Sequence, residues 1–211
     1  MNAEAIRNMM IRVCDEVIGQ EDTLCRLDSF IGDGDHGITA ARGFSAVKKC
    51  MEEETFFNPA GVMGRAGEAL ADTMGGAIGP IIGALFSGGV IHLKEKEDWN
   101  TVEFSTMFAD GLLQIKLIGG AKEGDRTLVD ALSPASAVLA ECAAAGKVLK
   151  TSMEKAALAA KAGAESTKEM VAKKGRAKFL GEKSRGYVDA GATTMYLVVS
   201  AMSEWINQEE A

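Results

Sequence analysis

The sequence is poor in proline, histidine and the large polar aromatics. It holds 3 prolines, 2 histidines, 2 tyrosines and 2 tryptophans in 211 residues. So little proline argues against long stiff linkers, and so few tyrosines and tryptophans, beside 11 methionines, favour helix over sheet. The chain also lacks the motif GxxxxGK[ST], so any nucleotide site must work without a P-loop.

Cysteine is scarce and unpaired. The four cysteines, Cys14, Cys25, Cys50 and Cys142, form no CxxC pair, which argues against a structural zinc site. No basic and apolar leader opens the chain, so we expect reduced thiols in a cytoplasmic protein. The net charge of -7 argues against a nucleic-acid partner, because such proteins neutralise phosphates with lysine and arginine.

One uncharged run is long enough to span a bilayer. It extends from Thr73 to Leu93. The run also contains a proline and a histidine, and glycines recur at every fourth position, at Gly75, Gly79 and Gly83. We interpret it as a buried helix whose glycine face meets a backbone or a ligand, and we expect no membrane partner.

Helical periodicity dominates the remainder. Ile6, Met9, Val13 and Val17 form one apolar face of a first helix that ends at Gly19. Further helices are expected near 36–52, 59–73, 77–94, 101–118, 126–145, 151–171 and 190–207. No convincing alternating strand is present, so the sequence predicts an all-α domain over residues 1–211 with about eight helices.

Two local signals refine these ranges. Thr151 and Glu154 match a capping box, which predicts a helix start at this point. Pro134 lies inside a helical run, where it should kink the helix or shift its start.

Four glycine-bearing connections separate the expected helices. They are 31–37 (IGDGDHG), 74–80 (MGGAIGP), 119–127 (GGAKEGDRT) and 174–191. If the helices alternate up and down, these connections follow helices one, three, five and seven. All four therefore emerge at the same end of the bundle, which predicts the location of a site.

The first connection collects acidic side chains. Asp28, Asp33 and Asp35 cannot share a ligand on a continuous helix, but Gly32 and Gly34 allow a loop that turns them together. Their mutual repulsion then favours a hard cation with oxygen ligands, Mg²⁺ or Ca²⁺. Mg²⁺ bound by a few carboxylates completes its shell with water and phosphate oxygens, so this loop predicts a phosphate-bearing ligand.

Two alternatives were weighed for this loop. An EF-hand that starts at Asp33 would need a glycine at Ile38 and a glutamate at Phe44, so this reading fails. A plain turn whose aspartates only cap the next helix stays open.

The other connections suit the same ligand. Gly75 and Gly76 can present backbone N–H groups to an anion at a helix start. The last connection carries six basic residues against one acid, and it is either a solvated face or a lid over polyphosphate. The basic residues are Lys173, Lys174, Arg176, Lys178, Lys183 and Arg185, and the acid is Glu182.

These motifs, in this order and spacing, resemble the L subunit of dihydroxyacetone kinase. The resemblance rests on LDSFIGDGDHG followed by RGF, on MGGAIGP, on EGDRTLVDAL and on GRAKFLGEKSRGYVDAGAT, and it covers essentially the whole chain. It implies a single-domain antiparallel barrel of eight helices, with ADP or ATP and two Mg²⁺ ions at one end.

The resemblance also implies roles for individual residues. Asp28, Asp33 and Asp35 match metal ligands and, with Arg176, the catalytic set. The implied nucleotide contacts are His36, Gly37, Ile38, Thr39, Ala77, Ile78, Gly119, Leu128, Arg176, Asp189, Ala190 and Gly191. The chain departs from the family at Ile78, where serine is common, at Thr39, where asparagine is frequent, and at Ala190, which replaces a proline.

The implied activity is phosphoryl transfer to dihydroxyacetone held on a separate K subunit. ADP would stay bound and be recharged by an M-type phosphohistidine carrier of the phosphotransferase system. The alternatives are an ATP-consuming triose or tetrose kinase subunit, a relative of fatty-acid kinases, and a non-catalytic Mg–nucleotide sensor that binds a protein partner. A homodimer is possible.

Overall fold

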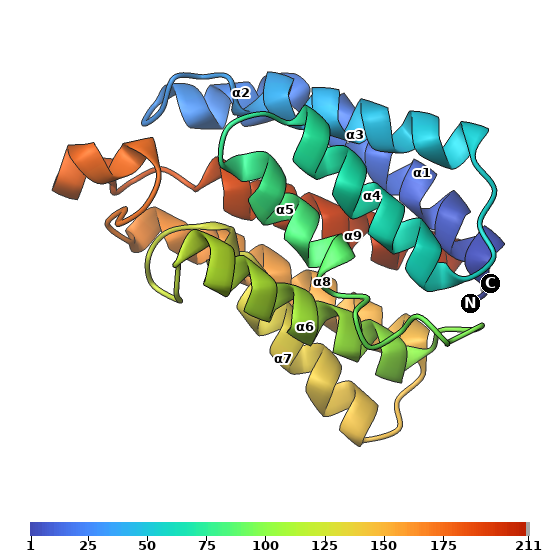
Figure 1. The fold of residues 1–211 in the computed structure, drawn as a ribbon. Coiled ribbons are helices and arrows are strands. Elements are labelled where there is room, and N and C mark those ends of the chain that lie inside the picture. Colours follow the sequence, from blue (N-terminus) through green and yellow to red (C-terminus); the bar gives the residue numbers. More distant parts are fainter. Residues whose placement is uncertain (210–211) are drawn as a thin grey trace.

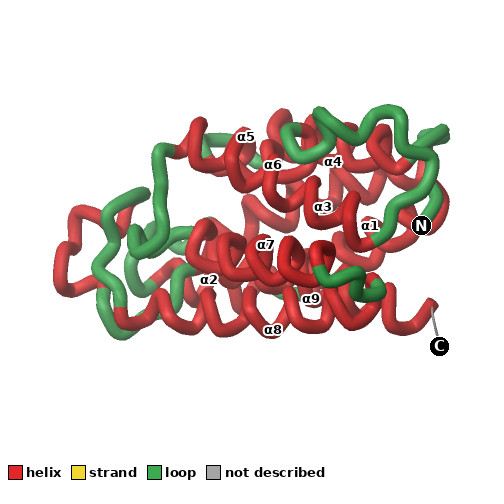
Figure 2. The backbone as a smooth tube through the Cα atoms, turned by 90° about the horizontal axis from the view of Figure 1, so that it is seen from below, coloured by secondary structure: helices red, strands yellow, loops and turns green. Residues whose placement is uncertain are grey.

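The computed structural model describes residues 1–209, and within that range the chain contains α-helices and short 3₁₀ helices but no strand (Figure 2). The helices are α1 (Ala3–Gly19), α2 (Glu21–Ser29), α3 (His36–Glu53), α4 (Pro59–Thr73), α5 (Ile78–Ser87), α6 (Thr101–Gly119), α7 (Leu128–Ala144), α8 (Leu149–Ser166), η1 (Thr167–Glu169), η2 (Arg176–Ser184) and α9 (Ala190–Glu209). The all-α prediction is confirmed. Residues 210 and 211 of the expected domain lie outside the described range.

The helices form a closed ring. Each of α3 to α9 packs on the next helix in the chain, and α9 returns to pack on α1, which itself packs on α3 (Figure 1). The enclosed core is built from buried aliphatic, methionine and phenylalanine side chains, including Met9, Phe44, Leu85 and Met202. The predicted antiparallel helical barrel is therefore the observed architecture.

Helix α2 was not predicted. Its nine residues are mostly polar and only Leu24 is fully buried, so no apolar stripe marked it in the sequence. It continues beyond the end of α1 rather than folding back on it, and it packs against α3 (Figure 1). Because α2 does not reverse the chain direction, it leaves the up-and-down alternation of the other helices unchanged.

Several expected boundaries need correction. The helix expected over 77–94 starts at Ile78 and ends at Ser87, because Gly88 and Gly89 follow and turns occupy the next residues. The capping box at Thr151 and Glu154 is wrong: α8 begins two residues earlier, after Val148, without a side-chain cap. The helix expected to reach residue 171 gives way to η1 after Ser166.

Capping boxes do occur, at two other helix starts. Asn100 with Glu103 caps α6, and Thr127 with Asp130 caps α7. The second box fixes the connection before α7, because Asp130 accepts hydrogen bonds from the N–H groups of Gly124 and Thr127 at 2.6 and 2.8 Å.

The glycine face predicted around residue 79 is present. An added Cβ at Gly67 would lie 2.6 Å from the carbonyl oxygen of Gly83, and one at Gly83 would lie 2.5 Å from that of Gly67. The backbones of α4 and α5 therefore touch where they cross. None of the helices in residues 1–209 combines the length and apolar composition that a bilayer crossing requires.

Pro134 does not set the start of its helix. It lies inside α7, which runs from Leu128 to Ala144. An added Cβ at Gly163 of α8 would lie 2.9 Å from the Pro134 ring, so glycine lets α8 approach α7 at this point.

Candidate functional site

The four glycine-bearing connections meet at one end of the barrel, as their order along the chain predicted. They enclose a cavity of about 630 Å³. Its lining includes Asp28, Asp33, Asp35, His36 and Thr39 from the first connection and the start of α3, Gly75, Gly76, Ala77 and Ile78 from the second, Gly119, Ala121, Arg126, Thr127 and Leu128 around the third, and Lys174, Gly175, Arg176, Asp189, Ala190 and Gly191 around the fourth. The N-terminus and the end of α9 lie at the opposite end (Figure 1).

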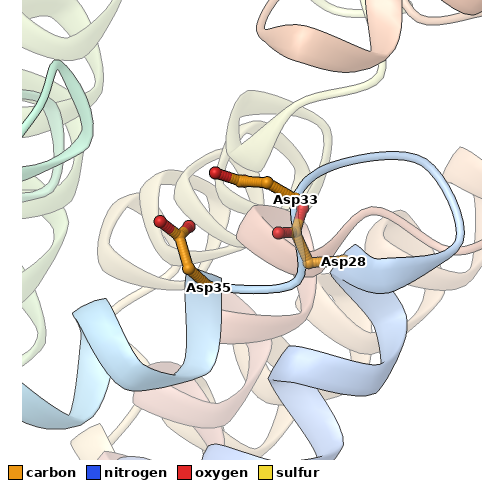
Figure 3. Close-up of side chains that lie close together, drawn as sticks. All are labelled: Asp28, Asp33 and Asp35. Atoms are coloured by element: carbon orange, nitrogen blue, oxygen red, sulfur yellow. The ribbon is translucent and has the colours of Figure 1, made fainter.

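The three aspartates converge at the mouth of this cavity. Asp28 lies in the last turn of α2, Asp33 lies in the loop and Asp35 precedes α3 (Figure 3). One carboxylate oxygen from each lies within 4.8 Å of the others. Among the described residues, the Asp35 carboxylate caps no N–H group of α3. The plain-turn alternative therefore does not account for Asp35, and the donor set suits a hard divalent cation.

Two glycines shape the aspartate loop, which we define as residues 28–35. Gly34 has a φ of 76° and its N–H donates to Asp28 Oδ2 at 2.8 Å. An added Cβ at Gly32 would lie 2.2 Å from Asp28 Oδ1. The carboxylate of Asp28 thus occupies space that a side chain at residue 32 would fill, and the loop holds it in place.

The last connection, 174–191, supplies positive charge beside the three carboxylates. Arg176, at the start of η2, forms an ion pair with Asp33. Both side chains are partly exposed, so this pair contributes little to stability. It does place a guanidinium beside the carboxylate cluster, where a bound polyphosphate would need positive charge.

His36 faces the first turn of α9. Its Nε2 lies 2.8 Å from Thr194 Oγ1, and that hydroxyl donates to the carbonyl of Ala190 at 3.0 Å. We assign the Nε2–H tautomer because the hydroxyl proton is already used. Burial lowers the pKa of His36, and the Asp28 carboxylate opposes this shift. A neutral ring that ties α3 to α9 follows from this arrangement.

The second connection offers backbone donors. Gly75 and Gly76 have φ values of 69° and 61°, and Ala77 precedes α5 with no side-chain acceptor for its first N–H groups. Arg42 holds this turn, because its guanidinium donates to the carbonyls of Thr73 and Met74 at 2.8 Å each. The uncapped start of α5 therefore faces the cavity and suits an anion.

Part of the cavity lining is apolar. The apolar lining residues include Ile81, Ile115, Ala121, Leu128 and Val129. The cavity therefore combines apolar side chains with carboxylates and backbone donors, a composition typical of small-molecule sites.

A largely buried ion pair, Arg126 with Asp189, lies in the wall of the cavity. Burial raises the pKa of Asp189 to about 6, while the N–H of Ala192 and the charge of Arg126 act in the opposite direction. Arg126 Nη1 lies 3.6 Å from Asp189 Oδ1.

The sequence-based list and the structure differ at a few positions. Gly37 and Ile38 were expected to contact the ligand but are not among the lining residues. Gly37 is a packing residue, since an added Cβ would lie 2.0 Å from the carbonyl of Glu21, and Ile38 is largely exposed. Arg42 and Arg126 were missed. Each lies inside a motif that was recognised, RGF and EGDRT, but neither pattern indicates where an arginine side chain points.

Comparisons with known proteins agree with this geometry. The family model described as DAK2 domain matches residues 30–204. L-erythrulose kinase of Pectobacterium atrosepticum is 37% identical over 203 residues, which are 92% of this chain and 33% of that protein. The ADP-binding subunit DhaL of PEP-dependent dihydroxyacetone kinase 2 from Listeria innocua is 34% identical over 88% of this chain and 86% of that protein.

A solved structure has the same fold. The dihydroxyacetone kinase of C. freundii in complex with AMP-PNP and Mg²⁺ superposes with a TM-score of 0.72 at 30% identity, over 94% of this chain and 33% of that one. The chain thus spans about a third of two of these relatives and most of the third. By its family match, by relatives of comparable length and by its fold, this chain belongs to the DAK2 domain family, which includes the DhaL subunits of dihydroxyacetone kinases.

Proposed function

We propose that this chain is the nucleotide-binding L subunit of a dihydroxyacetone kinase. It would carry Mg-bound ADP or ATP and pass a phosphoryl group to dihydroxyacetone on a separate K subunit. The observation that carries the proposal is the aspartate cluster, which opens into a cavity formed by all four glycine-bearing connections. The Listeria innocua relative of similar length, an ADP-binding subunit by name, supports the same assignment.

Asp28, Asp33 and Asp35 would hold the metal, and we propose two Mg²⁺ ions. The fit rests on the convergence of the three carboxylates and on the space at Gly32 that a Cβ would fill. Bound Mg²⁺ would neutralise the charge of the phosphate oxygens.

The remaining site residues bind and orient the nucleotide. The N–H groups at the start of α5 and the Arg176 guanidinium would contact phosphate oxygens, while Leu128 and Ile115 would cover the base. In the transfer, the acceptor oxygen bonds to the terminal phosphorus as the bond from phosphorus to the ADP oxygen breaks. No site residue stands out as a base for the acceptor proton, which supports a role for the K subunit in that step.

Further assignments extend this proposal. The PEP-dependent name of the Listeria innocua relative supports recharging of bound ADP by an M-type phosphohistidine carrier. The homodimer and the cytoplasmic location stay predictions from the sequence.

A second candidate is a kinase subunit that acts on a four-carbon ketose and consumes ATP. It is favoured by the 37% identity to L-erythrulose kinase. Activity with erythrulose that exceeds activity with dihydroxyacetone, under otherwise equal conditions, would select it.

The first experiment counts retained ligand. The purified protein is dialysed extensively and acid-denatured, and the released nucleotide and Mg²⁺ are identified. About one ADP per chain supports a held coenzyme, whereas reversible Mg-dependent ATP binding without retention supports a consumed substrate. If no nucleotide binds in either form, the proposal fails.

The second experiment tests the metal assignment. Asp33→Ala removes one carboxylate of the cluster and should abolish phosphoryl transfer even with a K subunit present. Asp72→Ala, at an exposed aspartate of α4, serves as the matched control and should leave transfer unchanged. Transfer by Asp33→Ala at the wild-type rate would overturn the assignment.

A further inference from the structure

Arg126 has an unusual conformation for a charged residue. Its side chain is almost fully buried, with 1% exposure, and it is the only non-glycine residue among 1–209 with a positive φ, at 62°. A positive φ is costly for a bulky side chain, and burial of a guanidinium adds a desolvation cost. A residue keeps such an unfavourable conformation only where the surrounding structure holds it, and residues of this kind often lie at functional sites.

The guanidinium is directed at the segment that precedes α9. Nη2 donates to the carbonyl of Tyr187 at 2.7 Å, and Nη1 lies 3.6 Å from the Asp189 carboxylate. Asp189 in turn accepts from the N–H of Ala192 at 2.8 Å, so it caps the first turn of α9. Arg126 therefore joins the loop before α7 to the residues that lead into α9.

The same segment reaches the aspartate loop. The ring of Tyr187 stacks on Phe30, with centroids 4.9 Å apart and planes 18° from parallel. Phe30 follows α2 directly, two residues after Asp28 and three before Asp33. Contacts thus run from Arg126 to Tyr187 and from the ring of Tyr187 to Phe30, which lies between Asp28 and Asp33 in the chain.

Arg126 borders the cavity, but its buried side chain offers no exposed group for a nucleotide. Its Nε and Nη1 atoms are closed to solvent and have no hydrogen-bond partner within the described chain. Any influence on the ligand must therefore pass through the residues that Arg126 holds. We propose that Arg126 is a positioning residue: it fixes the Tyr187–Asp189 segment and, through the stack of Tyr187 on Phe30, the aspartate loop. This inference rests on the proposed function, since it concerns the same nucleotide and metal site.

The test compares three variants. Arg126→Asn removes the guanidinium but tolerates the positive φ, because asparagine adopts this conformation more readily than most residues. Arg126→Lys keeps the charge but cannot reproduce the two-armed contact. Arg12→Gln is the control, since Arg12 likewise makes two contacts through its guanidinium, to Glu16 and Glu204, but is not among the residues that line the cavity.

Two readouts separate positioning from general stability. In the free protein, trypsin cleavage after Lys178 and Lys183 reports the order of the segment before α9, and we expect it to be at least fivefold faster in Arg126→Asn. Calorimetry then gives the dissociation constants of Mg-ADP and of Mg²⁺ alone. We expect Mg-ADP to bind at least about tenfold more weakly, the scale of one lost hydrogen bond to a charged group.

The direction of the Mg²⁺ effect is diagnostic. Loss of a nearby positive charge would by itself strengthen Mg²⁺ binding, whereas loss of positioning weakens it. Arg126→Lys should fall between Arg126→Asn and wild type, and Arg12→Gln should match wild type. In a double variant with Asp189→Asn, the loss in Mg-ADP affinity should be smaller than the product of the single losses, because both act through one contact.

The proposal is overturned if Arg126→Asn and Arg126→Lys fold and if their cleavage rates and dissociation constants stay within twofold of the wild-type values. If Arg126→Asn does not fold, Arg126→Lys decides by the same criteria. The cleavage readout needs no ligand, so it still decides the positioning role if the wild-type protein proves not to bind nucleotide, a result that would defeat only the proposed function.

Discussion

Glycine determines where the Asp28 carboxylate can lie. At Gly32 the φ angle is not in the left-handed region, so the backbone would accept another residue, but the space is already taken by the Asp28 side chain. At Gly34 the conformation itself requires glycine, and the N–H it presents anchors Asp28 Oδ2. The two glycines therefore act by different physical means on the same carboxylate.

Gly32→Ala should impair the metal site without unfolding the chain. The new Cβ must displace the Asp28 carboxylate, so we expect Mg²⁺ affinity to fall at least about tenfold, the scale of one lost charged contact. Gly32 is exposed, so the melting temperature should stay close to that of wild type. Calorimetric titration with Mg²⁺ measures the effect. Gly19→Ala, where nothing lies within 4 Å of the new Cβ, is the control, and equal affinities in both variants would refute the expectation.

Asp189 makes the stability of the fold depend on pH. Its pKa is about 6 in the folded chain, above the ordinary value of 3.8. A group whose folded pKa is raised destabilises the folded state when ionised, so the cost is fully present above about pH 6 and absent below about pH 4. Two pKa units correspond to on the order of 2–3 kcal/mol.

Asp189→Asn should remove this dependence while keeping a helix-capping side chain. Relative to wild type, the variant's free energy of unfolding should rise by about 2 kcal/mol between pH 4.5 and 7.5. Urea titrations of both proteins at several pH values provide the comparison. A difference that does not change with pH would mean that Asp189 titrates as it does in the unfolded chain.

At the scale of helices, the crossing of α4 and α5 sets the width of the barrel beside the site. Gly67 and Gly83 allow the two backbones to touch, and α5 can then bring its uncapped start to the cavity. A larger residue at either position would push the helices apart and move the N–H groups that face the ligand.

Gly67→Ala should destabilise the fold by about 1–3 kcal/mol through overpacking. The added Cβ would lie 2.5 Å from the backbone nitrogen of Ser87. The control lies in the same helix: at Gly64 the nearest atom to an added Cβ is 3.8 Å away, so Gly64→Ala should stabilise α4 by roughly 0.5–1 kcal/mol. Urea denaturation gives the free energy of unfolding of Gly67→Ala and Gly64→Ala. Equal changes in the two variants would contradict the close crossing of α4 and α5.

The sequence predicted most helices because their apolar stripes are strong. It missed α2 because a nine-residue helix with only Leu24 fully buried leaves no stripe to read. It placed a capping box at Thr151 because the pattern is short and occurs by chance, whereas the box at Asn100 and Glu103 went unrecognised. The position of a helix end depends on where the helix stops packing against its neighbours, and the pattern of a single sequence does not show those contacts.

At the scale of the whole molecule, closure of the ring links the ligand to global stability. The cavity takes residues from four connections, so a bound ligand would join segments that are far apart in the sequence. The up-and-down alternation of the helices predicted that the four connections meet at one end. It did not predict the contacts of Arg42 and Arg126, because these contacts join segments that are distant in the sequence.

Mg-ADP should therefore raise the melting temperature of the entire protein. At a hundredfold excess over the dissociation constant, binding contributes about 2.7 kcal/mol, which corresponds to roughly 5–10 °C for a chain of this size. Differential scanning calorimetry with and without ligand measures the shift. ADP with a chelator is the control, and an equal shift in its presence would exclude a role for the metal.

The direction of α9, which runs away from the cavity, constrains any larger assembly. Helix α9 begins at the cavity with Ala190 and runs 20 residues to Glu209, a length of about 30 Å. A module fused after α9 would need a tether of roughly nine extended residues to return along the barrel and reach the phosphate. A detached acceptor subunit, by contrast, can approach the open end directly.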